Sequence, residues 1–133
     1  MVTIVDGMNV VGTNPDGWWR NRSRARSALV AAIARWCADS DIDVHTVTIV
    51  FDGRPTDAEV ADAGVHGIEI VYAPDGPNAA DDVIVRLVGE VGRPGAVVVV
   101  TSDRVLAGRV RHAGAQVEGS KRFRTRLGLP DRQ

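Results

Sequence analysis

The chain has 133 residues, of which 44% are hydrophobic and 25% charged, and its formal net charge is −1. This length and composition predict a single globular domain over residues 1–133. A single cysteine, Cys37, excludes an internal disulfide and a zinc cluster built from cysteines. Without a recognisable signal peptide or a hydrophobic run of transmembrane length, the sequence predicts a cytoplasmic protein with no membrane partner.

Charge is distributed unevenly along the chain. Residues 1–103 contain 15 acidic and 8 basic side chains, whereas the remainder contains 8 basic side chains and, as acids, only Glu118 and Asp131. A basic C-terminal segment, starting at about residue 119, beside an acidic body predicts a polyanionic partner next to a cation site. The alternative is compositional, because 15 of the 16 basic residues are arginines and most charged residues are solvated surface.

Hydrophobic runs and helical periodicities alternate along the chain. Strands are predicted at residues 2–5, 44–51, 68–73 and 96–101, with a short fifth strand at 115–117. Amphipathic helices are predicted at 22–38, 79–91 and 104–113, whereas 54–66 has room for only a short one. This alternation predicts an α/β fold in three layers, with a parallel sheet between helices on both faces. The polar, basic segment after Gly119 predicts no definite element.

Acidic residues follow three of the predicted strands and open one of the helices. They are Asp6, Asp52, Asp81, Asp82 and Asp103. Because ligands bind beyond the carboxyl ends of parallel strands, we expect these carboxylates to meet at one edge of the sheet. A cation would relieve their mutual repulsion, and hard oxygen ligands select Mg²⁺ or Mn²⁺ over zinc.

The same acids also have structural interpretations, which remain open at this point. Asp103, or Ser102 beside it, can cap the following helix, and Asp52 before Gly53 can belong to a turn. Asn78 can likewise cap the next helix.

A helical wheel separates the two adjacent acids of that helix. Asp81 lies about 60° from the hydrophobic residue Ile84, whereas Asp82 lies about 160° away. We therefore expect Asp81 to face inward as a ligand, with Asp82 flanking the site or solvated.

Four segments, in this order and spacing, resemble the YacP-like branch of the NYN domains. They are VDGMNVVG, IVFDG, NAADDVIV and VVVTSDRVL. NYN domains belong to the PIN-like ribonuclease superfamily, and the resemblance extends over residues 2–124. It implies a PIN-like sheet with the first strand at its centre, a divalent-metal site at the strand ends, and cleavage of phosphodiester bonds in RNA.

The resemblance also assigns roles to single residues. The acids that match the family's catalytic, metal-holding positions are Asp6, Asp81 and Asp103. Asp82 and Asp52 match flanking acidic positions, the former beside the metal, and Asn9 matches the family's asparagine. Three residues, Asn9, Asp52 and Ser102, are expected to support the metal ligands or to contact the substrate. Family members often carry a second polar residue where Met8 stands, so no contact from that side chain is expected.

Basic and aromatic side chains flank the proposed site at both ends of the chain. The arginines near the first helix are Arg20, Arg22, Arg24 and Arg26, and the later basic residues are Arg104, Lys121, Arg122, Arg124 and Arg126. We expect them to grip the backbone of single-stranded RNA, free or on the ribosome. Trp18 and Trp19 would either stack on unpaired bases or cover the start of the first helix.

These inferences predict a divalent-metal-dependent endoribonuclease in which one or two Mg²⁺ or Mn²⁺ ions activate a water. One alternative is an NYN-like module that binds RNA but cuts it poorly. Another is a receiver-type phosphoacceptor domain, which also gathers acids at strand ends. That class requires an acidic pair after the first strand, and the sequence DGMN supplies one acid. A nuclease that acts on DNA also remains open.

Overall fold

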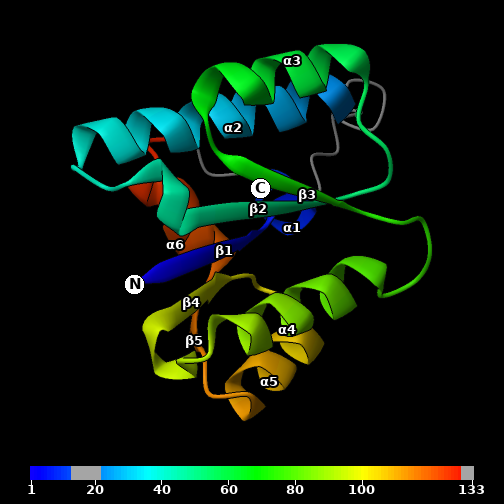
Figure 1. Cartoon of the computed structure of the whole chain (residues 1–133), viewed down its shortest axis with the longest axis vertical. Helices are drawn as coiled ribbons and strands as arrows, with labels where there is room; N and C mark the ends of the chain where they lie inside the picture. Colours follow the sequence, from blue (N-terminus) through cyan, green and yellow to red (C-terminus); the bar gives the residue numbers. More distant parts are fainter. Residues whose placement is uncertain (13–21, 130–133) are drawn as a thin grey trace.

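Five strands form one sheet in which all neighbouring strands are parallel (Figure 1). In the computed structural model, which describes residues 1–12 and 22–129, the order is β3-β2-β1-β4-β5. The strands are β1 (Val2–Asp6), β2 (Val47–Asp52), β3 (Glu69–Ala73), β4 (Val97–Val100) and β5 (Gln116–Glu118). Ile4 of the central strand is opposite Thr48 of β2 and Val99 of β4. The predicted parallel sheet with a central first strand is confirmed.

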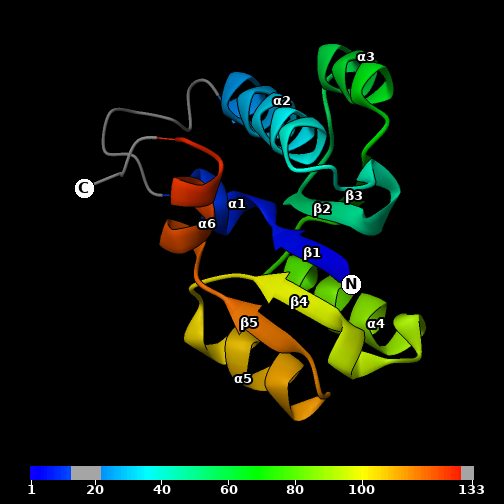
Figure 2. The ribbon, with the colours of Figure 1, turned by 90° about the vertical axis from the view of Figure 1, so that its left-hand side faces the viewer.

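Helices cover both faces of this sheet (Figures 1 and 2). They are α1 (Gly7–Val11), α2 (Arg22–Asp39), α3 (Asp57–His66), α4 (Ala79–Val91), α5 (Arg104–His112) and α6 (Ser120–Arg126). Helices α1, α2, α3 and α6 lie on one side, and α4 and α5 lie on the other. The predicted three-layer α/β arrangement is therefore confirmed.

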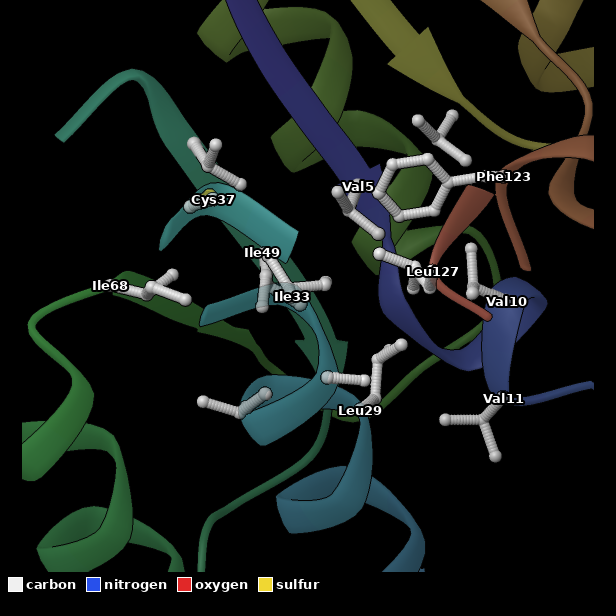
Figure 3. Close-up of a cluster of buried hydrophobic side chains, with 14 of the residues drawn as sticks. Val5, Val10, Val11, Leu29, Ile33, Cys37, Ile49, Ile68, Phe123 and Leu127 are labelled. Carbon is white, nitrogen blue, oxygen red and sulfur yellow. The ribbon is translucent and has the colours of Figure 1, made fainter. Parts of the chain in front are cut away.

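Alternating residues of the strands supply two hydrophobic clusters. Val5 and Ile49 belong to the cluster with α1, α2 and α6, where Phe123 and Leu127 also pack (Figure 3). Ile4, one residue earlier, belongs to the cluster with α4 and α5. Because successive side chains of a strand point to opposite faces, adjacent apolar residues such as Ile4 and Val5 bury both sides of the sheet.

The structure contains two short helices, α1 and α6, that the sequence pattern does not predict. Helix α1 follows β1 without a linker, and Gly7 makes this junction possible. A Cβ at Gly7 would lie 2.4 Å from the ring of Phe51 and 2.8 Å from the carbonyl oxygen of Val50. With five and seven residues, α1 and α6 are too short to show a helical period.

Strand boundaries differ from the predicted ones mainly at the start of β2 and β4. Residues Val44–Thr46 and Pro94–Ala96 form 3₁₀ turns before these strands. Apolar residues in a short turn and in a strand look alike in sequence, so the predicted strands at 44–51 and 96–101 begin too early.

The direction in which successive strands are added to the sheet reverses between β1 and β4, although the two strands are parallel. From β1 it builds β2 and β3 on one side, then crosses through α4 to β4 on the other side. The connections after β1 and β4 thus leave toward opposite faces, which opens a crevice at the carboxyl ends of these two adjacent strands.

Candidate active site

A pocket of about 550 Å³ lies beyond the carboxyl ends of β1 and β4. Its acidic residues are Asp6, Asp52, Asp81 and Asp103, its uncharged polar residues include Asn9, Ser102 and Ser120, and its basic residues are Lys121 and Arg124. Four of the five predicted acids are therefore brought to one pocket from three strand ends and one helix. The fifth, Asp82, is not part of the lining.

Asp6 is the most deeply buried acid of the pocket, with 7% of its surface exposed. The hydroxyl of Thr101 donates a hydrogen bond to Asp6 Oδ2 over 2.8 Å. Burial raises the pKa of Asp6 from 3.8 to about 6, and the nearby charges of Asp81 and Asp52 act in the same direction. The Thr101 hydrogen bond and the backbone of Asn9 oppose this shift. Asp6 is thus a buried carboxyl group among like charges.

Asp81 enters the pocket from the first turn of α4. Burial raises the pKa of its carboxyl, and the charge of Asp103 raises it further. Arg109 acts in the opposite direction, while Asp52 and Asp82 add to the increase. Asp81 therefore experiences the surplus of negative charge in the pocket.

Asp103 combines a structural contact with a place in the pocket. As the N-cap of α5, its Oδ1 accepts a hydrogen bond from the backbone N–H of Leu106 over 3.0 Å. The capping interpretation from the sequence is therefore correct for this residue. A carboxylate has two oxygens with several acceptor positions, so capping leaves it able to act as a ligand as well.

Asp82 lies on the exposed side of α4. Its Oδ1 is 2.9 Å from a guanidinium nitrogen of Arg109 on α5, and both side chains are substantially exposed. The orientations expected from the helical wheel, with Asp81 toward the pocket and Asp82 away from it, agree with these positions.

Asn9, Ser102 and Ser120 form a hydrogen-bonded group at the pocket edge. Asn9 Oδ1 accepts the backbone N–H of Ser102 over 2.8 Å and also the hydroxyl of Ser120. The backbone N–H of Ser120 in turn donates to Ser102 Oγ over 2.8 Å. The sequence analysis did not single out Ser120, whose contacts depend on the unpredicted helix α6.

Thr101 is a second residue that the sequence analysis missed. It is 1% exposed, it donates to Asp6, and its Oγ1 accepts the backbone N–H of Asp103 over 3.1 Å. One hydroxyl therefore holds two acidic positions in a fixed relation. The available signal was a polar residue between the four valines of β4 and Asp103.

Comparison with known proteins identifies the family. The sequence model of the YacP-like NYN domain matches residues 3–132. The chain belongs to the YacP-like NYN domain family. This is a family of PIN-like nucleases, so the receiver-type alternative is set aside.

Two solved structures have the same fold as this NYN domain. A crystal structure of a mutant of Rae1 (YacP) from Bacillus subtilis superposes with a TM-score of 0.74 at 21% identity, over 96% of this chain and 74% of that one. Another crystal structure of Rae1 (YacP) from the same organism gives 0.69 at 20% identity, with the same coverage of both chains. No curated protein matches the sequence of this NYN domain.

The donor chemistry of the pocket fits a hard divalent cation. Within residues 1–12 and 22–129, no three acidic, histidine or cysteine side chains are grouped closely enough to form a ready-made metal cage. Mg²⁺ does not need such a cage, since it keeps several waters and binds through one or two carboxylates together with substrate phosphates. Burial raises the pKa values of Asp6 and Asp81, and neighbouring carboxylates raise them further, a like-charge repulsion that a cation would offset.

The residues expected to bind RNA occupy different environments. Those that are exposed at the surface are Arg22, Arg24, Arg104, Lys121, Arg122 and Arg126. Arg124 is buried and lines the pocket, where its guanidinium donates to the carbonyl of Val10 over 3.0 Å. Trp18, Trp19 and Arg20 lie outside the described residues.

Arg26 and Arg126 have contacts that the sequence analysis did not anticipate. Arg26 is 4% exposed and pairs with Glu59, so the expectation that it grips RNA at the surface is wrong. Arg126 contacts Glu118 and lies 5.1 Å over the ring of Trp36.

Within the described part of the chain, no helix is long and apolar enough to cross a membrane.

Proposed function

We propose that this NYN domain is a divalent-metal-dependent endoribonuclease that hydrolyses RNA phosphodiester bonds in the pocket at the ends of β1 and β4. The observation that carries the proposal is the buried carboxyl of Asp6, whose pKa is raised to about 6 beside other acids. A cluster of this kind favours cation binding, and the family supplies the reaction class.

Asp6 and Asp81, together with Asp103, would hold Mg²⁺ or Mn²⁺. A bound ion would lower the pKa of a coordinated water and offset the charge that develops on the phosphate. Thr101 orients the Asp6 carboxylate and the loop that carries Asp103. The β2 end contributes Asp52, whose charge adds to the field at Asp6 and Asp81.

Substrate binding is assigned to basic residues that are exposed at the surface. Arg22, Arg24, Arg104 and Arg122 are exposed and would contact the RNA backbone. Trp18 and Trp19 would stack on unpaired bases, so the proposed substrate is single-stranded RNA. This RNA would be free or on the ribosome, and the protein would act in the cytoplasm. Charge reversal of Arg22 with Arg24 should weaken RNA binding and reduce its salt dependence.

A second candidate is an RNA-binding module with little nuclease activity. The observation in its favour is the absence of a preformed metal cage among the described residues. Such a module would bind RNA through the same arginines, and its affinity would not depend on Mg²⁺.

The deciding experiment incubates labelled single-stranded RNA with the protein in Mg²⁺ or Mn²⁺, with and without EDTA. We expect internal cleavage that EDTA abolishes and that Asp6→Asn reduces by a factor of roughly 100 or more. Glu90→Gln, which removes an exposed acid from the far end of α4, serves as the control and should cleave like the parent.

Two results would contradict parts of the nuclease proposal, namely its metal dependence and its site. Cleavage that persists in EDTA would remove the metal from the proposal, and equal cleavage by Asp6→Asn would remove the site. Binding without cleavage on single-stranded, duplex and ribosome-bound RNA would favour the binding module. Parallel reactions on DNA of the same sequence test the preference for RNA.

A further inference from the structure

The pocket is lined by acidic and by basic side chains that come from different elements. Asp6, Asp52, Asp81 and Asp103 reach it from the strand ends and α4, whereas Lys121 and Arg124 reach it from α6. The basic side chains thus come from a single short helix on one side of the opening. We call this side, formed by Ser120, Lys121 and Arg124, the α6 wall.

Hydrogen bonds fix the start of α6 relative to the acids. Ser120 contacts Ser102, which lies next to Asp103, and it also contacts Asn9, which lies in α1 directly after Asp6. The position of the α6 wall relative to Asp6 and Asp103 is therefore held by these bonds. A ligand that contacts both the α6 wall and the acidic residues would therefore meet a preorganised site.

The amide oxygen of Asn9 is used by two hydrogen bonds within the protein. A backbone N–H such as that of Ser102 can only donate, so the atom that it contacts must be the amide oxygen. This oxygen also accepts the Ser120 hydroxyl, which occupies its second lone pair. The remaining hydrogen-bonding group of Asn9, which lines the pocket, is the NH₂ donor.

The basic residues of α6 differ in burial and in the pocket that they line. Lys121 and Arg124 are three residues apart, so they share one face of the helix. Arg124 is buried and ties α6 to the carbonyl of Val10, whereas Lys121 is exposed at the pocket. Arg122 faces a different hollow, beside β5.

Four carboxylates around one opening repel a phosphodiester unless positive charge lies opposite them. A lysine ammonium is a compact charge that binds phosphate oxygens, and an amide NH₂ adds a directed donor. We propose that Lys121, supported by Arg124 and the Asn9 amide, forms a phosphate-binding wall that holds a phosphodiester of the RNA in the pocket that the carboxylates also line. This inference rests on the proposed function and names the residues that seat its substrate.

The test measures binding in EDTA of a fluorescent single-stranded RNA to variants that all carry Asp6→Asn, so that no cleavage intervenes. Lys121→Met keeps the side-chain length and removes the charge. It should weaken binding roughly ten- to a hundredfold, as for one charge-assisted hydrogen bond. Lys121→Arg should restore most of the affinity.

Matched controls remove the same charge elsewhere. Arg122→Met, on the same helix but outside the pocket, removes one expected contact with the RNA backbone and should weaken binding by less than about fivefold. Arg111→Met, at the exposed end of α5, should not change it. Inorganic phosphate should compete with RNA for the Arg122→Met protein and much less for Lys121→Met, which a purely structural role of Lys121 would not produce.

The outcomes separate this inference from the nuclease proposal. Equal losses for Lys121→Met and Arg122→Met, or equal competition by phosphate, would overturn the phosphate-binding wall even if the parent cleaves RNA. A selective loss for Lys121→Met in a parent that never cleaves would support the wall and reject the nuclease. Competition by phosphate with RNA affinity equal to the parent would indicate a site for free phosphate and overturn the assignment to RNA.

Discussion

Two polar clusters, each built around a buried charged side chain, lie near the carboxyl edge of the sheet, and they differ in charge balance. The α3 cluster consists of Arg26, Thr56 and Glu59, beneath α3. The pocket cluster consists of Asp6, Asp81 and Thr101, around the opening at β1 and β4.

In the α3 cluster, each charge has an opposite partner. Arg26 lies 3.5 Å from Glu59, donates to the carbonyl of Asp52, and sits 5.2 Å over the ring of Phe51. Glu59 also accepts the backbone N–H of Thr56 in a capping box at the start of α3. These bonds hold the β2–α3 loop and satisfy charges that are expensive to bury.

In the pocket cluster, buried charges have neighbours of the same sign. Asp6 is buried like Arg26, and this burial raises its pKa, but the nearby charges of Asp81 and Asp52 add to the increase instead of opposing it. The comparison teaches that burial of a charged residue alone does not mark a functional site. A surplus of one sign beside an opening does, because it is costly unless a ligand offsets it.

The largest expected effect on stability comes from breaking the α3 cluster. Arg26→Met should lower the free energy of unfolding by roughly 3–5 kcal/mol, because Glu59 would remain buried without its cation. Urea unfolding of the variant and the parent measures this difference. Arg35→Met, an exposed position on the same helix, is the control, and a loss below 1 kcal/mol in Arg26→Met would show that the pair is not essential.

Removing the central acid of the pocket should have the opposite sign. A folded-state pKa of about 6, above the usual 3.8, means that the stability of the parent falls as pH rises through this window. Asp6→Asn should therefore raise metal-free stability at pH 7 by up to about 3 kcal/mol, with the gain shrinking toward pH 4.

Melts of the parent and Asp6→Asn at pH 4.5 and pH 7 in EDTA test this sign. If the two proteins show the same pH dependence, the carboxyl of Asp6 is not destabilised in the folded state. Saturating Mg²⁺ should stabilise the parent, by about 2.7 kcal/mol at 100 times the Kd, and leave Asp6→Asn unchanged.

Asp81→Asn tests the like-charge repulsion at a second acid of the pocket, in the first turn of α4. It should leave metal-free stability equal or slightly higher, because one like-charge repulsion is removed, while cleavage collapses and RNA binding survives. The paired measurement is thermal melts with and without Mg²⁺ and cleavage rate at saturating RNA. If the residue only favours the start of α4, stability should instead fall by roughly 0.3–1 kcal/mol with activity intact.

The smallest effect is expected for the neighbouring acid. Asp82→Asn breaks an exposed ion pair with Arg109, which should change the free energy of unfolding by no more than about 1 kcal/mol. Cleavage should fall much less than in Asp81→Asn, as measured in the same assay. A loss as large as that of Asp81→Asn would place Asp82 among the ligands, contrary to its position outside the pocket.

Strand and helix patterns in the sequence were sufficient for the fold class. Valine-rich runs predict strands buried on both faces, and the predicted helix over 79–91 agrees with α4. The same regularity predicts that Asp6, Asp52, Asp81 and Asp103 approach one edge, since strand ends align in a parallel sheet. Helices α1 and α6 escape prediction because they are shorter than the window in which a helical period becomes visible.

By itself, then, the sequence determined the α/β class, the positions of most elements and the acids at the strand ends, because these follow from local periodicity and chain order. Only the tertiary structure decided that Arg26 is buried against Glu59, that Thr101 holds Asp6, and that α6 brings Lys121 to the pocket that the acids line. These contacts join segments up to 95 residues apart for Asp6 and Thr101, and they depend on strand order and on which face each helix covers. No local pattern encodes such pairings, since burial and electrostatic field are properties of the assembled chain.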